Sequence, residues 1–339
     1  MLMQRTLTST TAFLALLASA ATAQEVNVYS SRHYDSDDAL YEKFTEETGI
    51  AVNRIEGDAD EMIARIAAEG ENSPADVFLA VDAGRMARAE EAGILAPLES
   101  EVIAEKIPAH LRHPDGLWFG LSQRARIIFY AKDRVENPPQ TYEALADPEW
   151  EGKICIRSSS NVYNQSLLAA MIEQLGEDGA REWAEGIVAN MARPPEGGDT
   201  DQLRGVISGE CDVAVANHYY FLRAFDEEVD GVSDAVDSLG WVWPNQEDRG
   251  AHVNLATASL VTGAPNPEEA TQLLEFFTTD WAQQHIADQN HEYPAVEGVD
   301  ADTGTERLGD FKPDSDTQTS AYSANIKAAQ QIFNEVGWN

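Results

Sequence analysis

Apolar and polar residues alternate along the first third of the chain in a way that predicts a strand, a loop and a helix, repeated several times. Residues 26–30 alternate with a period of two, as a half-buried strand does. Leu40, Tyr41 and Phe44 have helical spacing, and Gly49 is typical of the end of that helix. The same order recurs in strands at 51–55 and 77–81 and helices at 58–69 and 83–92. This alternation predicts a mostly parallel sheet flanked by helices.

The middle of the chain repeats this alternation between two further strand candidates at 127–131 and 255–262. Between them we expect strands at 153–156 and 213–217 and helices at 164–175, 179–190, 200–208 and from about Tyr219. A second α/β lobe inserted into the first explains this order. The C-terminal third is predicted to be helical at 267–278, 281–290 and 320–336.

The first 23 residues have the pattern of a secretory signal peptide. Arg5 precedes an apolar run at 12–18, and the small residues Ala21 and Ala23 mark a cleavage site before Gln24. The alternative is a buried N-terminal helix. No later stretch approaches the ~18 consecutive apolar residues of a spanning helix, so we expect export without membrane insertion.

Composition narrows the class of protein. The chain has 339 residues, enough for roughly two domains of ~150 residues each. Its 59 acidic and 23 basic side chains give a formal net charge of −36. Such a surface repels both the phosphate backbone of nucleic acids and anionic lipids, which makes binding to either unexpected.

Export also bears on the two cysteines, Cys155 and Cys211, because disulfides persist in oxidising compartments. A Cys155–Cys211 disulfide is the favoured interpretation, with two separate buried thiols as the alternative. No pair of histidines accompanies them in a zinc-finger pattern.

Three predicted loops that follow strands carry tyrosines. They contain Tyr34 beside His33, Tyr163, and the pair Tyr219 and Tyr220. In open α/β sheets, ligands bind outside the carboxyl ends of the strands, where such loops lead into helices. We therefore expect the three loops to form a ligand site.

Tyrosines suit a highly charged metal ion. Ionising a phenol with a pKa near 10 at neutral pH costs about 4 kcal/mol, so several phenolates need a strongly charged cation. Ca²⁺ prefers carboxylates and carbonyls, and Zn²⁺ prefers Cys and His. A tyrosine-rich loop set thus points to Fe³⁺, with Fe²⁺ as the alternative oxidation state.

Several segments resemble the periplasmic ferric-ion-binding proteins of iron ABC transporters, the bacterial transferrins. The resemblance covers essentially the whole mature chain and rests on these segments: 28–34 (VYSSRHY), 73–78 (SPADVF), 121–126 (LSQRAR), 161–166 (NVYNQS), 208–212 (SGECD) and 217–220 (NHYY). Each motif is weak alone, and together they are specific.

The resemblance implies a type II periplasmic binding protein fold, in which each of two lobes is a mixed sheet flanked by helices. Two crossover strands, expected near 123–131 and 241–245, join the lobes. After a signal peptide at 1–23, the N-terminal lobe comprises 24–122 and 246–297, and the C-terminal lobe comprises 123–245 and 298–339.

The resemblance also implies a metal-ligand set, which is His33, Tyr34, Tyr163, Tyr219 and Tyr220. Arg124, Arg126 and Arg223 are expected as cations behind the ligands, where they favour the phenolate form. Related proteins that recruit a phosphate or carbonate carry a Glu after the third strand. This chain has Val81-Asp82-Ala83 there, so no such anion is expected.

The resemblance implies a monomeric periplasmic protein that closes on iron and docks on an inner-membrane ABC permease. The alternative is a binding protein for a quaternary ammonium solute such as betaine or choline, held in a tyrosine cage. An enzyme is not expected, because the sequence has no Gly-x-Ser-x-Gly elbow, His-Glu-x-x-His motif or Gly-rich phosphate loop.

Overall fold

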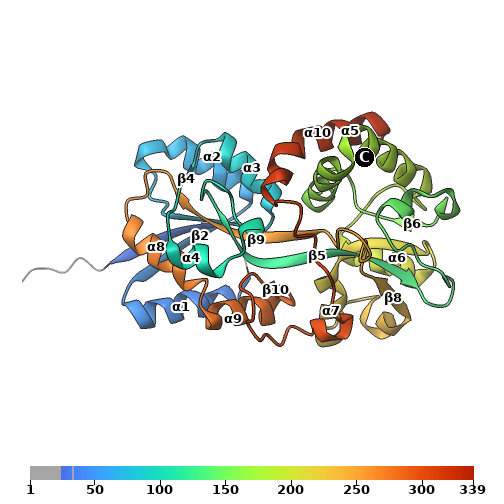
Figure 1. The fold of residues 1–339 in the computed structure, drawn as a ribbon. Coiled ribbons are helices and arrows are strands. Elements are labelled where there is room, and N and C mark those ends of the chain that lie inside the picture. The colour runs from blue at the N-terminus through green and yellow to red at the C-terminus, as the bar shows by residue number, and fades with distance from the viewer. Residues whose placement is uncertain (1–23, 33) are drawn as a thin grey trace, which may run out of the picture.

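The structure, a computed structural model, describes residues 24–32 and 34–339. The predicted signal peptide and His33 lie outside the described residues. Two α/β lobes lie side by side and are joined by long strands that run between them (Figure 1). This is the predicted two-lobed fold, and its strands follow the order β2-β1-β3-β9-β5-β7-β6.

The first lobe is built on a mixed sheet. Strands β2 and β3 both pair with β1 in parallel, and β9 pairs with β3 in the antiparallel direction. The strands are β1 (Glu25–Ser30), β2 (Ala51–Glu56), β3 (Val77–Ala80), β4 (Leu95–Ala96), β9 (Val253–Val261) and β10 (Tyr293–Pro294). The helices are α1 (Asp37–Thr48), α2 (Ala59–Glu69), α3 (Ala83–Glu91), α4 (Glu101–Lys106), α8 (Pro267–Phe276) and α9 (Asp280–Asn290).

The second lobe is built around β7, which pairs with β6 in parallel and with β5 in the antiparallel direction. Its strands are β6 (Ile154–Cys155), β7 (Val213–Asn217) and β8 (Leu239–Val242), together with the second part of β5 (Phe119–Ala131). Its helices are α5 (Val162–Asn190), α6 (Asp199–Ser208), α7 (His218–Asp226) and α10 (Ser320–Val336).

Strand β5 is the main connection between the lobes. Its first part, to Ala125, pairs with β9, and its second part, from Arg126, pairs with β7 and β8. The hydrophobic pattern predicted a strand at 127–131, the resemblance placed a crossover strand near 123–131, and the observed strand begins earlier, at Phe119. Polar residues such as Ser122 and Arg124 interrupt the apolar pattern before residue 127, yet both are buried in the folded protein.

The position expected for the second crossover was wrong. Residues 239–242 form β8, which stays in the second lobe and pairs with Ile128–Ala131 of β5. The chain returns to the first lobe through β9, which pairs with both β5 and β3. Apolar residues such as Trp241 are typical of a buried crossing strand. In the structure, Trp241 packs instead against Phe221 of α7, within the second lobe.

Helices α5 and α10 cover one side of the second lobe, and α10 also contacts α3 of the first lobe (Figure 1). Helix α5 is interrupted at Gly176, which has a φ of 74° in the left-handed region. This break accounts for the two helices predicted at 164–175 and 179–190. No helix among the residues described in the structure has the length and apolar character needed to cross a membrane.

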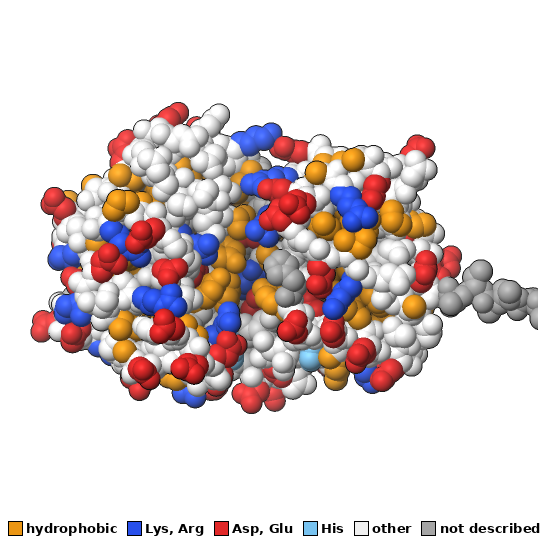
Figure 2. Space-filling view, turned by 180° about the vertical axis from the view of Figure 1, so that it is seen from behind, with side chains coloured by type: hydrophobic (Ala, Val, Ile, Leu, Met, Phe, Trp, Pro, Cys, Tyr) orange, Lys and Arg blue, Asp and Glu red, His pale blue; other side chains and the backbone are white. Residues whose placement is uncertain are grey.

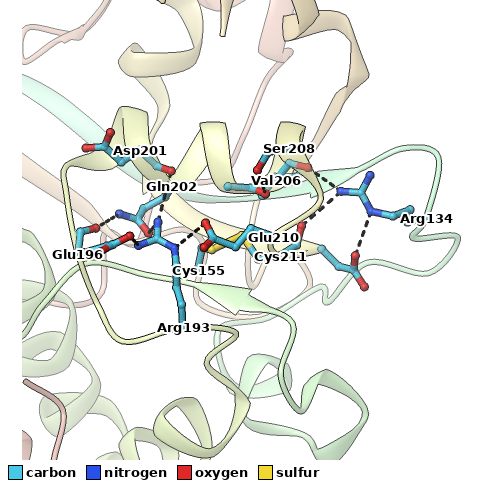
Figure 3. Close-up of a disulfide and its surroundings, with 12 residues drawn as sticks. Arg134, Cys155, Arg193, Glu196, Asp201, Gln202, Val206, Ser208, Glu210 and Cys211 are labelled. Carbon is cyan, nitrogen blue, oxygen red and sulfur yellow. Dashed lines mark hydrogen bonds and ion pairs between the residues drawn. A yellow bond between two sulfur atoms is a disulfide. The ribbon is translucent and has the colours of Figure 1, made fainter. Parts of the chain in front are cut away.

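The predicted disulfide between Cys155 and Cys211 is present and joins β6 to the loop before β7 (Figure 3). Both cysteines are buried against α6, where a Cβ at Gly205 would lie 2.9 Å from each sulfur. On one side of the disulfide, the Arg134 guanidinium donates to the carbonyls of Val206 (2.6 Å) and Cys211 (3.3 Å). The disulfide therefore links β6 to the loop between α6 and β7, within the second lobe.

Candidate metal-binding site

Three of the predicted tyrosine ligands meet between the lobes. The Tyr163 and Tyr219 hydroxyl oxygens are 3.2 Å apart. Tyr34 lines a cavity of about 240 Å³ together with Tyr163, and a neighbouring cavity of about 370 Å³ together with Tyr219. Figure 2 shows the seam between the lobes, along which basic side chains gather although the chain is strongly acidic.

The second lobe presents its tyrosines on the first turns of two helices. Tyr163 is the second residue of α5, and the Asn161 side chain caps this helix by accepting from the Tyr163 N–H (3.1 Å). Tyr219 and Tyr220 follow the buried strand β7 directly, in the first turn of α7, with ring centroids 4.4 Å apart. The positive end of a helix dipole favours anionic groups in its first turn, so both helices favour phenolates here.

The first lobe contributes Tyr34 from the loop between β1 and α1. The Tyr34 carbonyl accepts from the Asp37 N–H (2.9 Å) as α1 begins. The Arg32 guanidinium carbon lies 4.9 Å from the centroid of the Tyr34 ring. Arg32 is itself fixed by two hydrogen bonds of 3.0 Å to the buried Asp37 carboxylate. His33, the predicted neighbour in the ligand set, lies outside the described residues.

Burial dominates the protonation of the tyrosines. It raises the pKa of Tyr34, and the Glu292 carboxylate raises it further, while Arg124 lowers it. Burial likewise raises the pKa of Tyr219 well above its usual value, and the Tyr163 and Tyr220 phenols add to the effect. Without a cation beside them, Tyr34 and Tyr219 stay neutral phenols at neutral pH. Only a strongly charged ion offsets the cost of ionising several of these tyrosines.

Two predicted arginines lie behind the tyrosines. The Arg124 Nε is 3.2 Å from Glu292, and both side chains are almost completely buried. The Arg126 guanidinium is paired with Asp199 at 3.1 Å and donates to Asn164 Oδ1 at 2.7 Å. Guanidinium groups held beside phenols favour the phenolate form.

The third predicted arginine, Arg223, is more peripheral. It lines the larger cavity together with Tyr34 and Tyr219. Its Nη2 is 2.8 Å from Glu227 in a pair that is about half exposed to solvent. Solvent screens such a pair, so Arg223 influences the tyrosines less than the buried arginines do.

Four charged residues of the site were missed by sequence reasoning: Arg32, Arg157, Asp199 and Glu292. The Arg157 guanidinium carbon lies over the Tyr163 ring, 5.4 Å from the ring centroid. Arg157 Nη1 is also 3.5 Å from Asp199 Oδ1. Arg32 and Arg157 follow strands at the same sheet edge as the tyrosines, which is a signal that could have found them. No comparable sequence pattern marks Asp199 and Glu292, because their partners Arg126 and Arg124 are far from them in the sequence.

His218 is excluded as a free ligand by its hydrogen bonds. It is fully buried, its Nε2 is 2.8 Å from the His291 carbonyl, and its Nδ1 is 3.2 Å from the Ala125 nitrogen. Burial lowers the pKa of His218 to about 4, so the ring is neutral at physiological pH. No group of three His, Cys, Asp or Glu side chains suited to a metal occurs in the described part of the chain. The tyrosines are therefore the donors that distinguish this site.

Comparisons with known proteins show the family to which the chain belongs. Residues 72–308 match the family described as bacterial extracellular solute-binding protein. Iron uptake protein A1 of Synechocystis sp. is 48% identical, over 93% of this chain and 88% of that protein. A Trichodesmium protein solved in complex with iron and citrate ligands is 48% identical, with a TM-score of 0.90 over 93% of this chain and all of that one.

A ferric binding protein from Campylobacter jejuni is 38% identical, with a TM-score of 0.85 over 93% of this chain and all of that one. The fold and the similarity along nearly the whole chain define a periplasmic-type solute-binding protein. This chain belongs to the bacterial extracellular solute-binding protein family, within its group of periplasmic ferric-ion-binding proteins of iron uptake.

Proposed function

We propose that the protein captures ferric iron in the cleft between its lobes through the phenolates of Tyr34, Tyr163, Tyr219 and Tyr220, with His33 completing the set. The observation that carries this proposal is the 3.2 Å separation of the Tyr163 and Tyr219 hydroxyls on two helix N-termini, beside Tyr34. Relatives that bind iron and share nearly the whole chain support it. Fe²⁺ is the alternative oxidation state of the cargo.

The charges around the tyrosines suit a trivalent ion. Each phenol loses a proton on binding, which costs about 4 kcal/mol at neutral pH before burial is counted. Glu292 balances the charge of Arg124, and Arg126 and Arg157 share the carboxylate of Asp199, so these groups together leave a single positive charge. The ion itself must then supply most of the positive charge that stabilises the phenolates, and Fe³⁺ supplies more than a divalent ion does.

Binding and lobe movement are linked in this proposal. The N-terminal lobe (24–122 and 246–297) carries Tyr34, and the C-terminal lobe (123–245 and 298–339) carries the other tyrosines. An ion that binds both sets of donors stabilises the closed arrangement more than the open one, and this difference in affinity drives closure.

The family of the chain suggests how bound iron is delivered to the cell. We propose that the chain is exported to the periplasm after removal of residues 1–23 and acts there as a monomeric binding protein rather than an enzyme. The closed, loaded form docks on an inner-membrane ABC permease, which receives the iron. The net charge of −36 is consistent with a protein that binds neither nucleic acid nor anionic lipid.

Iron retention against citrate tests this proposal. Mature wild-type protein and the Tyr219→Phe and Tyr220→Phe variants are dialysed to equilibrium against ferric citrate, and bound iron is counted per chain. We expect both variants to lose most of the retained iron, because the ring stays and only the donor oxygen is removed. Tyr130→Phe is the matched control, since Tyr130 packs against Gly240 of β8 in the second lobe. Unchanged retention in both test variants would contradict the assignment.

A further inference from the structure

A second contact between the lobes lies one helical turn beyond Tyr163, where α3 of the first lobe meets α5 of the second. Ser166 Oγ of α5 donates to Asp82 Oδ1 at 2.8 Å. Asp82 is the N-cap residue of α3, and its Oδ1 also accepts from the Gly84 N–H at 2.7 Å. Asp82 and Ser166 are both fully buried. The hydrogen bond therefore joins the N-cap of α3 to the second turn of α5, and these helices belong to different lobes.

The same carboxylate is tied to the strand that returns between the lobes. Asn254, the second residue of β9, donates from Nδ2 to Asp82 Oδ2 at 2.9 Å and accepts from the Ala83 N–H at 3.0 Å. The side chain of Asp82 is thus held from three sides by Gly84, Asn254 and Ser166. Of these contacts, only the one to Ser166 reaches the second lobe, so lobe opening breaks that hydrogen bond and spares the other two.

Gly84 explains why the two helices come so close. A Cβ at this position would lie 2.8 Å from Ser166 Oγ, 3.0 Å from Asp82 Oδ1 and 3.3 Å from Ile326 Cδ1 of α10. The nearest of these atoms, Ser166 Oγ, and Ile326 Cδ1 belong to the second lobe. A side chain at Gly84 would consequently act as a wedge between the lobes.

Ser166 lies three residues after Tyr163 on α5, so the two side chains share one face of the helix. We propose that the Asp82–Ser166 hydrogen bond and the space left by Gly84 set the alignment of the closed lobes and thereby position Tyr163 against Tyr34. Asp82, Gly84 and Ser166 are positioning residues in this account. The inference rests on the proposed iron capture for its effect on binding, while the effect on lobe alignment stands by itself.

Two substitutions and their combination test the contact. Gly84→Ala adds a methyl group between the lobes, and Ser166→Ala removes the hydroxyl that donates to Asp82. The double variant adds the methyl group but removes Ser166 Oγ, the atom nearest to it. We expect Gly84→Ala to weaken retention of iron against citrate at least tenfold, and Ser166→Ala to weaken it about two- to tenfold, as expected for one net hydrogen bond. The double variant should bind iron more tightly than Gly84→Ala alone, which is a coupling that simple loss of stability does not produce.

Small-angle X-ray scattering, with and without iron, measures the alignment directly. Gly84→Ala should have a larger radius of gyration than wild type in both states, and the double variant should return toward the wild-type value. The controls are Lys327→Ala, which removes an exposed ion pair to Glu91 between α10 and α3, and Gly198→Ala, where the added methyl has no neighbour nearer than 3.7 Å. Both controls should match wild type within about twofold in iron retention.

The outcomes separate this inference from the proposed function. If wild type retains no iron, the proposed function fails, and an expanded Gly84→Ala variant in scattering still supports the alignment contact. A Gly84→Ala variant whose radius of gyration and iron retention both equal those of wild type would overturn the inference. So would an expanded Gly84→Ala variant that retains iron as wild type does, because the contact would then not position the tyrosines.

Discussion

The two sides of the cleft are built differently. On the second lobe, Tyr163, Tyr219 and Tyr220 stand on two helix N-termini. On the first lobe, Tyr34 comes from a loop beside the Arg32–Asp37 pair. The second lobe thus holds most of the proposed donors in one preformed surface, and the first lobe adds a donor when the lobes are together. Under the proposed function, we expect iron to meet the second lobe first and Tyr34 to complete its capture.

The supports behind the tyrosines differ in the same way. Asp199 on the second lobe is paired with both Arg126 and Arg157, and it also accepts from the Asn217 N–H at 2.8 Å. It therefore connects the surroundings of Tyr163 with the residue that precedes α7. Asp37 on the first lobe holds a single arginine, Arg32. Substitution of Asp199 should therefore affect several of the proposed donors, whereas substitution of Asp37 should affect only the surroundings of Tyr34.

The largest effect on iron binding is expected from a comparison of Tyr163→Phe with Tyr34→Phe. Loss of a donor oxygen on the second lobe should weaken iron binding by more than the ~10–100-fold typical of residues behind a metal site. Tyr34→Phe should still allow iron to bind to the second lobe, but without lobe closure. Competition with citrate measures the affinities, and scattering measures closure. Equal losses of affinity with closure retained in Tyr34→Phe would contradict the proposed order of events.

A smaller effect on iron is expected from Asp199→Asn. Arg126 and Arg157 would lose their buried counter-charge, so we expect about 10–100-fold weaker iron binding and a free energy of unfolding lower by about 3–5 kcal/mol. Asp37→Asn is the matched variant on the first lobe and should lower stability with less effect on affinity. Urea unfolding and citrate competition provide the two readouts. A larger loss of affinity in Asp37→Asn would reverse the comparison between the lobes.

Removal of the disulfide should affect the stability of the second lobe and leave iron binding nearly unchanged. The cysteines are 56 residues apart in sequence, and closing such a loop contributes about 4 kcal/mol in the chain-entropy model. The Cys155→Ser/Cys211→Ser double variant should show faster hydrogen exchange in α6 and β7 than in the first lobe. Iron affinity should stay within about twofold of wild type. A uniform increase of exchange in both lobes would show that their stabilities are not separate.

The smallest effect on iron is expected at His252, which lies just before β9. His252 is buried, and neither ring nitrogen has a hydrogen-bond partner among residues 24–32 and 34–339. Burial lowers its pKa to about 3. Its unfolded-state pKa is near 6.5, so the unfolded chain takes up the proton first and stability falls as the pH drops from about 6.5 toward 3. The melting temperature of metal-free protein should therefore fall between pH 7 and pH 4.5, and it should fall less in His252→Phe than in wild type. An unchanged pH dependence would contradict the assignment.

The sequence predicted the parts of the fold that local patterns encode. Helical spacing located α5 and α10, and the tyrosine loops were placed at one edge of the sheet by a general rule of α/β folds. Residues 119–122 at the start of β5 were missed, since Ser122 does not look like a buried strand residue until Glu292 is known to pair with it. Asp199 was missed for a similar reason, because its role depends on Arg126 and Arg157, which are distant in the sequence.

Whether tyrosine phenolates hold the iron can be seen in a visible absorption titration of metal-free mature protein with ferric citrate. We predict a phenolate-to-iron charge-transfer band that gives an orange to red colour and saturates at one iron per chain. The same titration is repeated in the presence of betaine. A protein that stays colourless, and whose tyrosine or tryptophan fluorescence responds to betaine, would contradict the account.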